Sequence, residues 1–387
     1  MALSSNIWKL YIYRALSALE FMLPIFVIFL LDNNLSLTQI LILQAAYAVA
    51  LLMLEIPTGA FADRYGRKKS IIIASIIVFA ACIIYASGRS FTGFFMAEIL
   101  WAVGASFWSG ADTAFLYDTL KDLKRENEFK KICGTLNSIE SIFFGIGGLI
   151  GGFLVIYGLR FPFYMTLIPL GIAMIIPFTL KEPQLFQKVK YRYWTHIKDA
   201  IKHTAKHTRL RFIIAYSAIL AVTTEVVFFL YQPYLQSINI PLTLFGIIFA
   251  VFSAIFALGS KLAHRIEPRL GEKTTLLGIM LVSAAAIFMI SRTAAFYVII
   301  FFMVFEFTCG LARPVLLSYL HHHIESYRRA TIISLNNMSR SLSIAIIAPL
   351  FGAIADYWSL QTAFMIIAIM LAVYFMILAV VFIIFRR

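Results

Sequence analysis

Charged residues are scarce in this chain of 387 residues, and that scarcity determines its class. Asp, Glu, Lys and Arg make up 13% of the sequence, well below the roughly 25% found in soluble domains. Hydrophobic residues make up 61%, and the mean hydropathy is +0.88. A soluble globular fold cannot bury so many apolar residues, so we expect the chain to use lipid as its solvent.

The sequence also lacks the alternation of polar and apolar residues that barrel strands require. Its apolar runs instead reach the ~20 residues that a helix needs to cross a bilayer. We therefore expect an all-α polytopic membrane protein with twelve transmembrane helices. The expected spans are residues 11–31, 39–58, 70–87, 92–117, 132–157, 161–180, 211–235, 243–262, 274–291, 296–319, 330–355 and 361–385.

Chemistry-bearing patterns are also few. Cys82, Cys133 and Cys309 have no metal or redox spacing, so we interpret them as small apolar residues and expect no disulfide and no metal site. The sequence contains no nucleotide loop of the GxxxxGK[ST] type and no recognisable Ser/His/Asp set. We therefore expect neither an enzyme nor an ATP-driven pump, and no cofactor.

Basic residues outnumber acidic ones, which gives a net charge of +14. One side of the expected spans holds 27 Lys and Arg residues, whereas the other holds only Arg89, Arg160 and Arg292. By the positive-inside rule the richer side is cytoplasmic, and both termini lie there. This topology accounts for the basic character, so no nucleic-acid partner is expected.

One long polar stretch divides the chain. It is predicted to be a cytoplasmic basic linker with an amphipathic helix near residues 193–207 that lies on the inner leaflet. The halves repeat at an offset of about 200 residues, and Gly59 aligns with Gly259. The predicted parts are an N-terminal six-helix bundle (1–180), the linker (181–210) and a pseudo-symmetric C-terminal six-helix bundle (211–387).

The second and third expected spans are joined by GAFADRYGRKK, residues 59–69. The positive-inside rule explains its cations but neither Asp63 nor the glycine spacing. Gly59 permits close approach of a neighbouring helix, and Gly66 permits a turn backbone that other residues resist. The pattern GxxxDRxGRKK resembles the signature loop of the major facilitator superfamily of secondary transporters.

The resemblance implies a cytoplasmic gate. In the family, the loop Asp caps the start of the eleventh helix, and a loop Arg pairs with an acid that ends the fourth. In this chain those partners are the helix start near residues 330–331 and Asp118, and a carboxylate is favourable at a helix N-terminus. The predicted gating residues are Gly59, Asp63, Arg64, Gly66, Arg67 and Asp118.

The fifth span carries closely spaced glycines that predict tight helix packing. The family's antiporters have GPxxGG at this location, and this chain has Gly148 in place of the proline, which weakens the inference of antiport. The predicted packing residues are Gly147, Gly148, Gly151 and Gly152.

Charged residues inside the spans are the sharper clue. A charge at a span centre costs on the order of 3 kcal/mol, so it usually faces a cavity or a partner. Spans one, four, seven and ten line the central cavity in the family, and each carries an acid here. Internal salt bridges, such as Glu306 with Arg340, remain the alternative. The predicted residues of the substrate and proton cavity are Glu20, Glu98, Trp101, Trp108, Asp112, Glu140, Glu225, Gln232, Glu306, Arg313 and Arg340.

Acids beside indole and phenyl rings suit lipophilic cations, and the motifs resemble the drug-exporter branch. We therefore expect a secondary active transporter that works by alternating access and couples drug efflux to the proton gradient. We expect a monomer in the inner cell membrane whose partners are a small-molecule substrate, protons and membrane lipids. The alternative is a proton-coupled or facilitative carrier of an endogenous metabolite, lipid or anion, which Arg313 and Arg340 favour.

Overall fold

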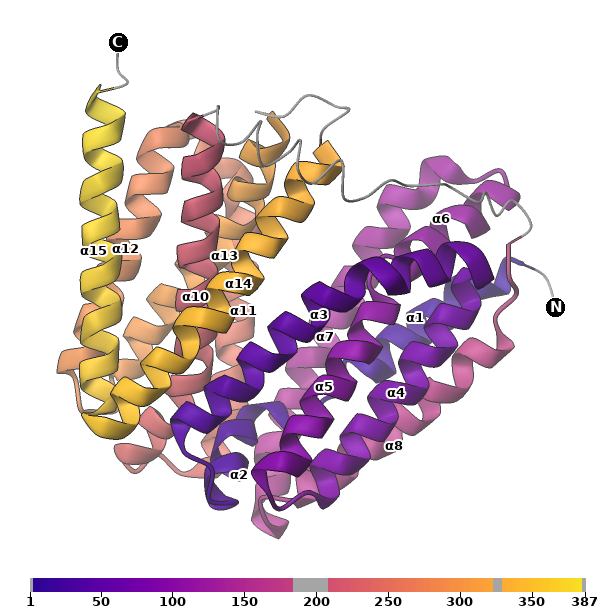
Figure 1. The fold of residues 1–387 in the computed structure, drawn as a ribbon, viewed down its shortest axis with the longest axis horizontal. Coiled ribbons are helices and arrows are strands. Elements are labelled where there is room, and N and C mark those ends of the chain that lie inside the picture. The colour runs from indigo at the N-terminus through magenta and orange to yellow at the C-terminus, as the bar shows by residue number, and fades with distance from the viewer. Residues whose placement is uncertain (1–2, 184–207, 323–328, 385–387) are drawn as a thin grey trace. The chain divides into compact units, whose positions relative to one another are not determined.

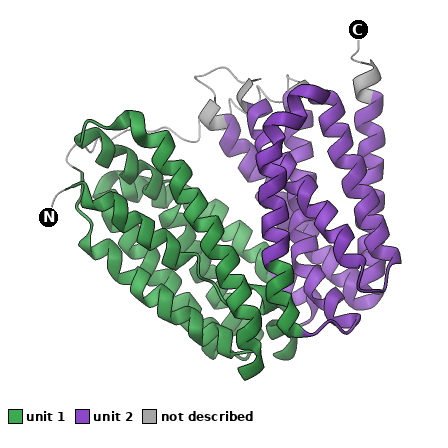
Figure 2. Ribbon diagram, turned by 180° about the vertical axis from the view of Figure 1, so that it is seen from behind, with its two compact units in different colours: residues 1–35, 43–191, 242–249 green, residues 36–42, 192–241, 250–387 purple. Residues whose placement is uncertain are grey.

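The computed structural model describes residues 3–183, 208–322 and 329–384, and these parts are helical apart from short connections (Figure 1). The expected all-α class is confirmed. The amphipathic helix expected in the linker lies outside the described residues. Figure 2 shows two compact units: unit 1 comprises residues 1–35, 43–191 and 242–249, and unit 2 comprises residues 36–42, 192–241 and 250–387.

The first half of the sequence supplies most of unit 1. Its helices are α1 (Ser5–Ser17), α2 (Phe26–Asp32), α3 (Leu37–Tyr65), α4 (Arg67–Ser87), α5 (Phe91–Trp108), α6 (Ala111–Asp122), α7 (Phe129–Leu154) and α8 (Phe161–Ile175). The core of this unit includes a cluster of aromatic rings, in which Phe163 packs against Phe29 and Tyr85 packs against Phe26. The first turn of α3 belongs to unit 2.

The second half supplies most of unit 2. Its helices are α10 (Thr208–Ser237), α11 (Phe245–Leu270), α12 (Glu272–Arg292), α13 (Val298–His322), α14 (Arg329–Tyr357) and α15 (Leu360–Ile384). Buried rings again form part of the core, with Phe302 in contact with Tyr234 and Phe364. The first turn of α11 belongs to unit 1.

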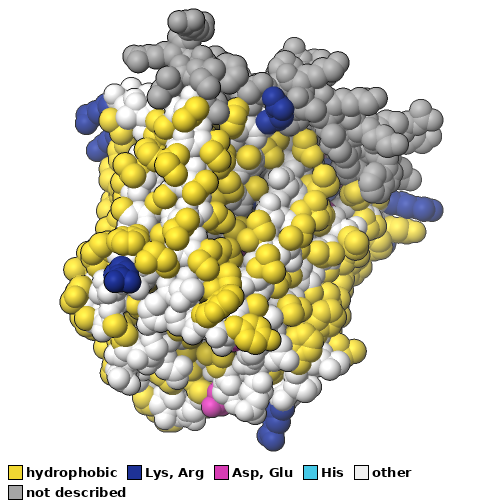
Figure 3. All heavy atoms as spheres, turned by 60° about the vertical axis from the view of Figure 1, so that its left-hand side comes forward, with side chains coloured by type: hydrophobic (Ala, Val, Ile, Leu, Met, Phe, Trp, Pro, Cys, Tyr) yellow, Lys and Arg dark blue, Asp and Glu magenta, His cyan; other side chains and the backbone are white. Residues whose placement is uncertain are grey.

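Eleven helical segments of the described residues are long and apolar enough to cross a membrane. Hydrophobic side chains cover most of the face in Figure 3, with isolated Lys and Arg side chains among them. Several helices run past their apolar cores: α3 ends at Tyr65 and α11 at Leu270. Helical hydrogen bonding continues into the polar region, because a helix end is set by its backbone and not by hydropathy.

The first expected span, residues 11–31, is interrupted in the structure. Helix α1 ends at Ser17, a 3₁₀ turn follows at Leu23–Ile25, and α2 begins at Phe26. Pro24 lies in that 3₁₀ turn, has no backbone N–H and restricts the residue before it. The helical ladder is therefore interrupted at residues 18–22, and Glu20 lies inside the interruption.

The fourth span is interrupted as well. Helix α5 ends at Trp108, and α6 starts at Ala111 after Gly110, whose φ of 77° is left-handed. Glycine adopts this conformation without the Cβ clash that penalises other residues. The interruption separates α6 from α5 and places Asp112 in the first turn of α6.

The glycines of α7 allow other backbones to approach it closely. A Cβ built on Gly147 would lie 3.0 Å from the backbone nitrogen of Glu20, and one on Gly151 would overlap the carbonyl of Phe21. On an adjacent face, Gly152 lies against Gly246 of the first turn of α11. The glycine face therefore supports the interrupted part of the first span.

Candidate functional site

Arg14 of α1 forms ion pairs with two acids from other helices of unit 1. Its Nη1 donates to Oε2 of Glu140 on α7 at 2.5 Å, and its Nη2 donates to the carboxylate of Asp112 on α6. The side chains of Arg14 and Asp112 are 18% and 11% exposed, whereas that of Glu140 is 46% exposed. The cluster contains one cation and two acids, so it carries one negative charge in excess. Glu140 is the most exposed of the three side chains.

Aromatic rings complete this cluster. The guanidinium of Arg14 lies 5.0 Å from the ring centroid of Trp108, which stacks on Tyr13 at 4.6 Å. An aromatic face attracts a cation. Sequence reasoning selected the two acids and Trp108 but missed Tyr13 and the role of Arg14 as counter-ion. An arginine inside an apolar run was the available signal for Arg14.

Glu20 lies in the interruption of the first span. Its N–H donates to the Ala18 carbonyl at 2.9 Å, and its own carbonyl accepts from Leu23 at 3.4 Å, so regular i to i−4 pairing is lost. The side chain is half-buried and lies within electrostatic range of Glu140. Interrupted membrane helices leave backbone polar groups available to ions and substrates. Glu20 is thus near, but separate from, the Arg14 cluster.

Glu98 lies in a different environment. It is buried at 5% exposure, and its Oε1 accepts a hydrogen bond from Nε2 of Gln44 at 2.6 Å. Trp101, one turn further along α5, packs edge-on against the ring of Tyr85. The structure therefore does not align Glu98 and Asp112 along one uninterrupted helical stripe, because α5 ends between them. Gln44 was not anticipated as the partner of Glu98.

Unit 2 contains the remaining candidates. Arg313 and Arg340 are exposed, and Arg340 lies within electrostatic range of Arg313 and Glu225. Among the described residues Glu306 forms no ion pair with Arg340, so that predicted alternative is not seen. Gln232 is fully buried. This unit thus offers two accessible cations, whereas unit 1 offers an accessible acid.

The signature loop is held by contacts inside unit 1. Nη1 of Arg67 donates to Asp118 of α6 and to the Ala114 carbonyl at 2.6 Å. Arg64 contacts no acid among the described residues and lies 5.3 Å from the ring of Tyr65. Arg67 is thus the loop arginine that meets Asp118. The pairing of Asp63 with the helix start near residues 330–331 stays a prediction.

A residue outside the motif completes the loop. The carboxylate of Glu182 accepts the backbone N–H of Arg67 at 2.8 Å and that of Lys68 at 3.0 Å, so it caps α4. Burial raises the pKa of Glu182 above its ordinary value. Gly66 has a φ of 106°, and a Cβ there would lie 3.1 Å from the Glu182 carboxylate. Sequence reasoning had assigned Glu182 to the linker.

One glycine of the motif has a different role from the expected one. Close helix approach at Gly59 was predicted, but a Cβ built there meets no atom of the described residues within 4 Å. Gly59 lies inside α3, where its missing side chain leaves open space. Tight packing involves Gly66 and the α7 glycines instead.

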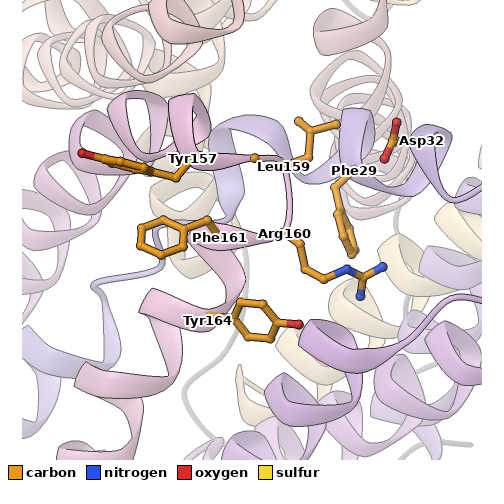
Figure 4. Close-up of a pocket in the computed structure, with 8 residues that line it drawn as sticks. Phe29, Asp32, Tyr157, Leu159, Arg160, Phe161 and Tyr164 are labelled. Atoms are coloured by element: carbon orange, nitrogen blue, oxygen red, sulfur yellow. The ribbon is translucent and has the colours of Figure 1, made fainter.

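A second polar and aromatic group lies at the other end of unit 1. A pocket of about 300 Å³ is lined by Phe29, Asp32, Tyr157, Gly158, Leu159, Arg160, Phe161 and Tyr164 (Figure 4). Arg160 donates to the carbonyls of Ala86 and Gly88 and to Oδ1 of Asn33, each at 2.8 Å. These bonds join three helix ends, so the arginine has a structural task. In the described residues no three His, Cys, Asp or Glu side chains form a metal-binding group.

The sequence is similar to a family of membrane transporters and to individual members of it. The family model described as Major Facilitator Superfamily matches residues 10–348 and 211–387. Multidrug resistance protein 2 of Bacillus subtilis is 26% identical over 359 residues, which cover 89% of this chain and 86% of that protein. The uncharacterized MFS-type transporter YxaM of the same species is 23% identical over 363 residues, covering 90% and 89%.

Solved structures share the fold at low sequence identity. The nucleoside transporter NupG superposes with a TM-score of 0.79 at 15% identity, covering 99% of each chain. The human organic anion transporter MFSD10 has a TM-score of 0.65 at 15% identity, covering 98% of this chain and 100% of that one. Together with the family match, this places the chain in the major facilitator superfamily of membrane transporters.

Proposed function

We propose that the protein is a proton-coupled exporter of lipophilic cations that works by alternating access. The cluster of Arg14, Asp112 and Glu140 carries this proposal. Its excess negative charge and the exposed Glu140 carboxylate attract a cation, and the neighbouring stack of Trp108 on Tyr13 offers an aromatic surface. The similarity to a protein named for multidrug resistance supports this substrate class.

Proton coupling is assigned to Glu20. It lies where the first span is interrupted, it is half-buried, and it has no ion pair among the described residues. A carboxylate in such a place is costly to keep charged, so it takes up a proton when no cation is near. Its electrostatic link to Glu140 connects protonation to occupation of the cluster.

The topology follows from the charges. We place both termini and the signature loop on the cytoplasmic side of the inner membrane, and we take the monomer as the transporting unit. The Arg67–Asp118 contact and the Glu182 cap hold the loop in shape, while Asp63 caps the α14 start when the cytoplasmic side is closed. No enzymatic activity is assigned.

A carrier of an endogenous anion is the second candidate. It is favoured by the exposed Arg313 and Arg340 of unit 2, which a pocket for cations does not need. The human organic anion transporter MFSD10 shares this fold at 15% identity.

Transport by the purified protein in proteoliposomes distinguishes the two candidates. A pH gradient should drive accumulation of a lipophilic cation such as ethidium, and Glu140→Gln should abolish it. Arg313→Gln with Arg340→Gln should leave cation transport largely intact. If instead an organic anion is accumulated and the arginine variants abolish this, the second candidate replaces the first. Absence of gradient dependence with either solute rejects proton coupling.

A further inference from the structure

The second half carries its own version of the signature loop at the end of α11. Gly66 and Gly271 both have positive φ values, 106° and 76°, and each precedes the next helix, α4 or α12. Helix α11 continues for 11 residues beyond Gly259, whereas α3 continues for six beyond Gly59. The extra turn carries groups that the first loop lacks.

The charges of this longer helix end are arranged differently. Ala263 stands where the alignment of Gly259 with Gly59 would place Asp63. The acid Glu267 faces α13, since the Tyr319 hydroxyl donates to its Oε1 at 2.8 Å. Arg265 and Arg269 are exposed and form no ion pair within the described parts of the chain. Both are therefore available to an anion from outside.

These two arginines border a hollow on the surface of unit 2. The hollow is about 420 Å³ and is lined by Leu262, Arg265, Ile266, Arg269 and Leu270. Arg265 and Arg269 are four positions apart, so they lie one above the other on the same helix face.

The same face continues toward the middle of the span as an aliphatic stripe. Ile247, Val251, Leu258 and Leu262 repeat at steps of four and seven residues, and the first three are 39%, 38% and 45% exposed. Gly259 lies on another face, packed against the backbone of α13 at Phe307. An exposed aliphatic stripe thus leads directly into a pair of cations at the end of the span.

We infer that this hollow binds the phosphate of an anionic phospholipid, with an acyl chain along Leu258 and Leu262. Guanidinium groups hold phosphate oxygens with paired hydrogen bonds, and basic groups at a membrane surface attract anionic lipids. The aliphatic stripe favours a lipid over a free phosphate, because only a lipid can occupy both the hollow and the stripe. The inference concerns the membrane contact of α11 and is independent of the transported substrate.

Native mass spectrometry of the full-length protein with phosphatidylglycerol or phosphatidylcholine tests this site. Arg265→Gln with Arg269→Gln should weaken phosphatidylglycerol binding about 30-fold, the product of two lost surface contacts. Phosphatidylcholine carries the same phosphate but no net charge, so its binding should weaken much less. Lys130→Gln with Lys131→Gln is the matched control, because both lysines are exposed and the same charge is removed.

Several outcomes would overturn the assignment. Equal weakening in both double variants means attraction by bulk charge, and no weakening in the arginine variant excludes the hollow. Displacement of the lipid by an equal concentration of inorganic phosphate means a site for free phosphate. Should the glutamine variant not fold, Arg265→Lys with Arg269→Lys keeps the charge, and undiminished phosphatidylglycerol binding would then count against recognition by paired guanidinium hydrogen bonds.

Discussion

The carboxylate of Asp356 accepts two hydrogen bonds from Thr38, 318 positions earlier in the chain: one from its backbone N–H at 2.7 Å and one from its hydroxyl at 2.6 Å. The other carboxylate oxygen accepts the N–H of Leu37 at 3.0 Å. Asp356 lies at the end of α14, and its partners form the first turn of α3. Within unit 2, therefore, an acid of the second half caps a helix of the first.

The sequence at this cap resembles the first five residues of the signature motif. Residues 352–356 read GAIAD, and residues 59–63 read GAFAD. Gly352 lets the helices meet, because a Cβ there would lie 2.8 Å from the Cα of Thr38. From the family resemblance we predict the same task for Asp63 at the start of α14.

Asp356→Ala should lower stability by about 1 kcal/mol, because the first amides of α3 lose their acceptor. The midpoint of thermal unfolding in detergent, followed by circular dichroism, reports the change. Tyr357→Phe is the control, since Tyr357 is 84% exposed and should leave the midpoint unchanged. An equal midpoint in the two variants would show that the cap contributes nothing.

Arg67→Ala should impair transport and lower stability by on the order of 2 kcal/mol, because it leaves the Asp118 carboxylate partly buried without its cation. Arg64→Ala removes the same charge from the same loop, but the only contact that it removes among the described residues is the one with the Tyr65 ring. Its transport rate and stability should therefore remain close to those of the wild type. The measurements are the transport rates and the midpoints of thermal unfolding of the two variants. Similar losses in both variants would mean that the loop acts only through its total charge.

Glu20→Gln should abolish pH-gradient-driven transport and preserve substrate exchange at equal pH, because glutamine resembles the protonated acid. Glu98→Gln is the comparison, since Glu98 is buried and bonded to Gln44. We expect it to retain gradient-driven transport. Transport by Glu20→Gln at the wild-type rate under a gradient would move coupling to another acid, with Glu225 and Glu306 next to be replaced.

The pH dependence of stability should reveal Glu182. Its pKa is raised in the folded state, so the fold binds more protons than the unfolded chain. Its contribution is therefore most favourable below the ordinary pKa of about 4.3 and declines as pH rises above that value. Glu182→Gln should reduce the dependence of the unfolding free energy on pH between acidic and neutral values. The glutamine side-chain oxygen should still cap α4. An unchanged slope in the variant would assign the dependence to other groups.

The sequence predicts the helical spans well because a membrane span needs a long apolar run, and such runs are visible without any structure. The interruption of the first span is different. Pro24 signals it, yet Pro57, Pro314 and Pro349 all lie inside uninterrupted helices. Proline weakens a helix locally, and tertiary packing decides whether it breaks. Here the close backbone contact of Gly151 with Phe21 accompanies the break.

Long-range partners are harder to read. Resemblance to the family offers Asp118 as the partner of a loop arginine, and the structure places Arg67 beside it. Nothing in the local pattern points to Arg14 between Asp112 and Glu140, which are 98 and 126 positions away. A charged residue inside a span indicates that it has a partner, but only the three-dimensional structure identifies that partner. The functional roles of these residues stay predictions.

The Glu182 cap also affects where the protein can be split into two fragments that are expressed separately. A first fragment that ended at residue 180 would lose the acceptor for the Arg67 and Lys68 amides. A fragment that extends through Pro183 retains it, together with the bond from the Lys181 N–H to Oδ1 of Asn6. Co-expressed halves should therefore reassemble into a working transporter more efficiently when the first fragment extends through Pro183 than when it ends at residue 180.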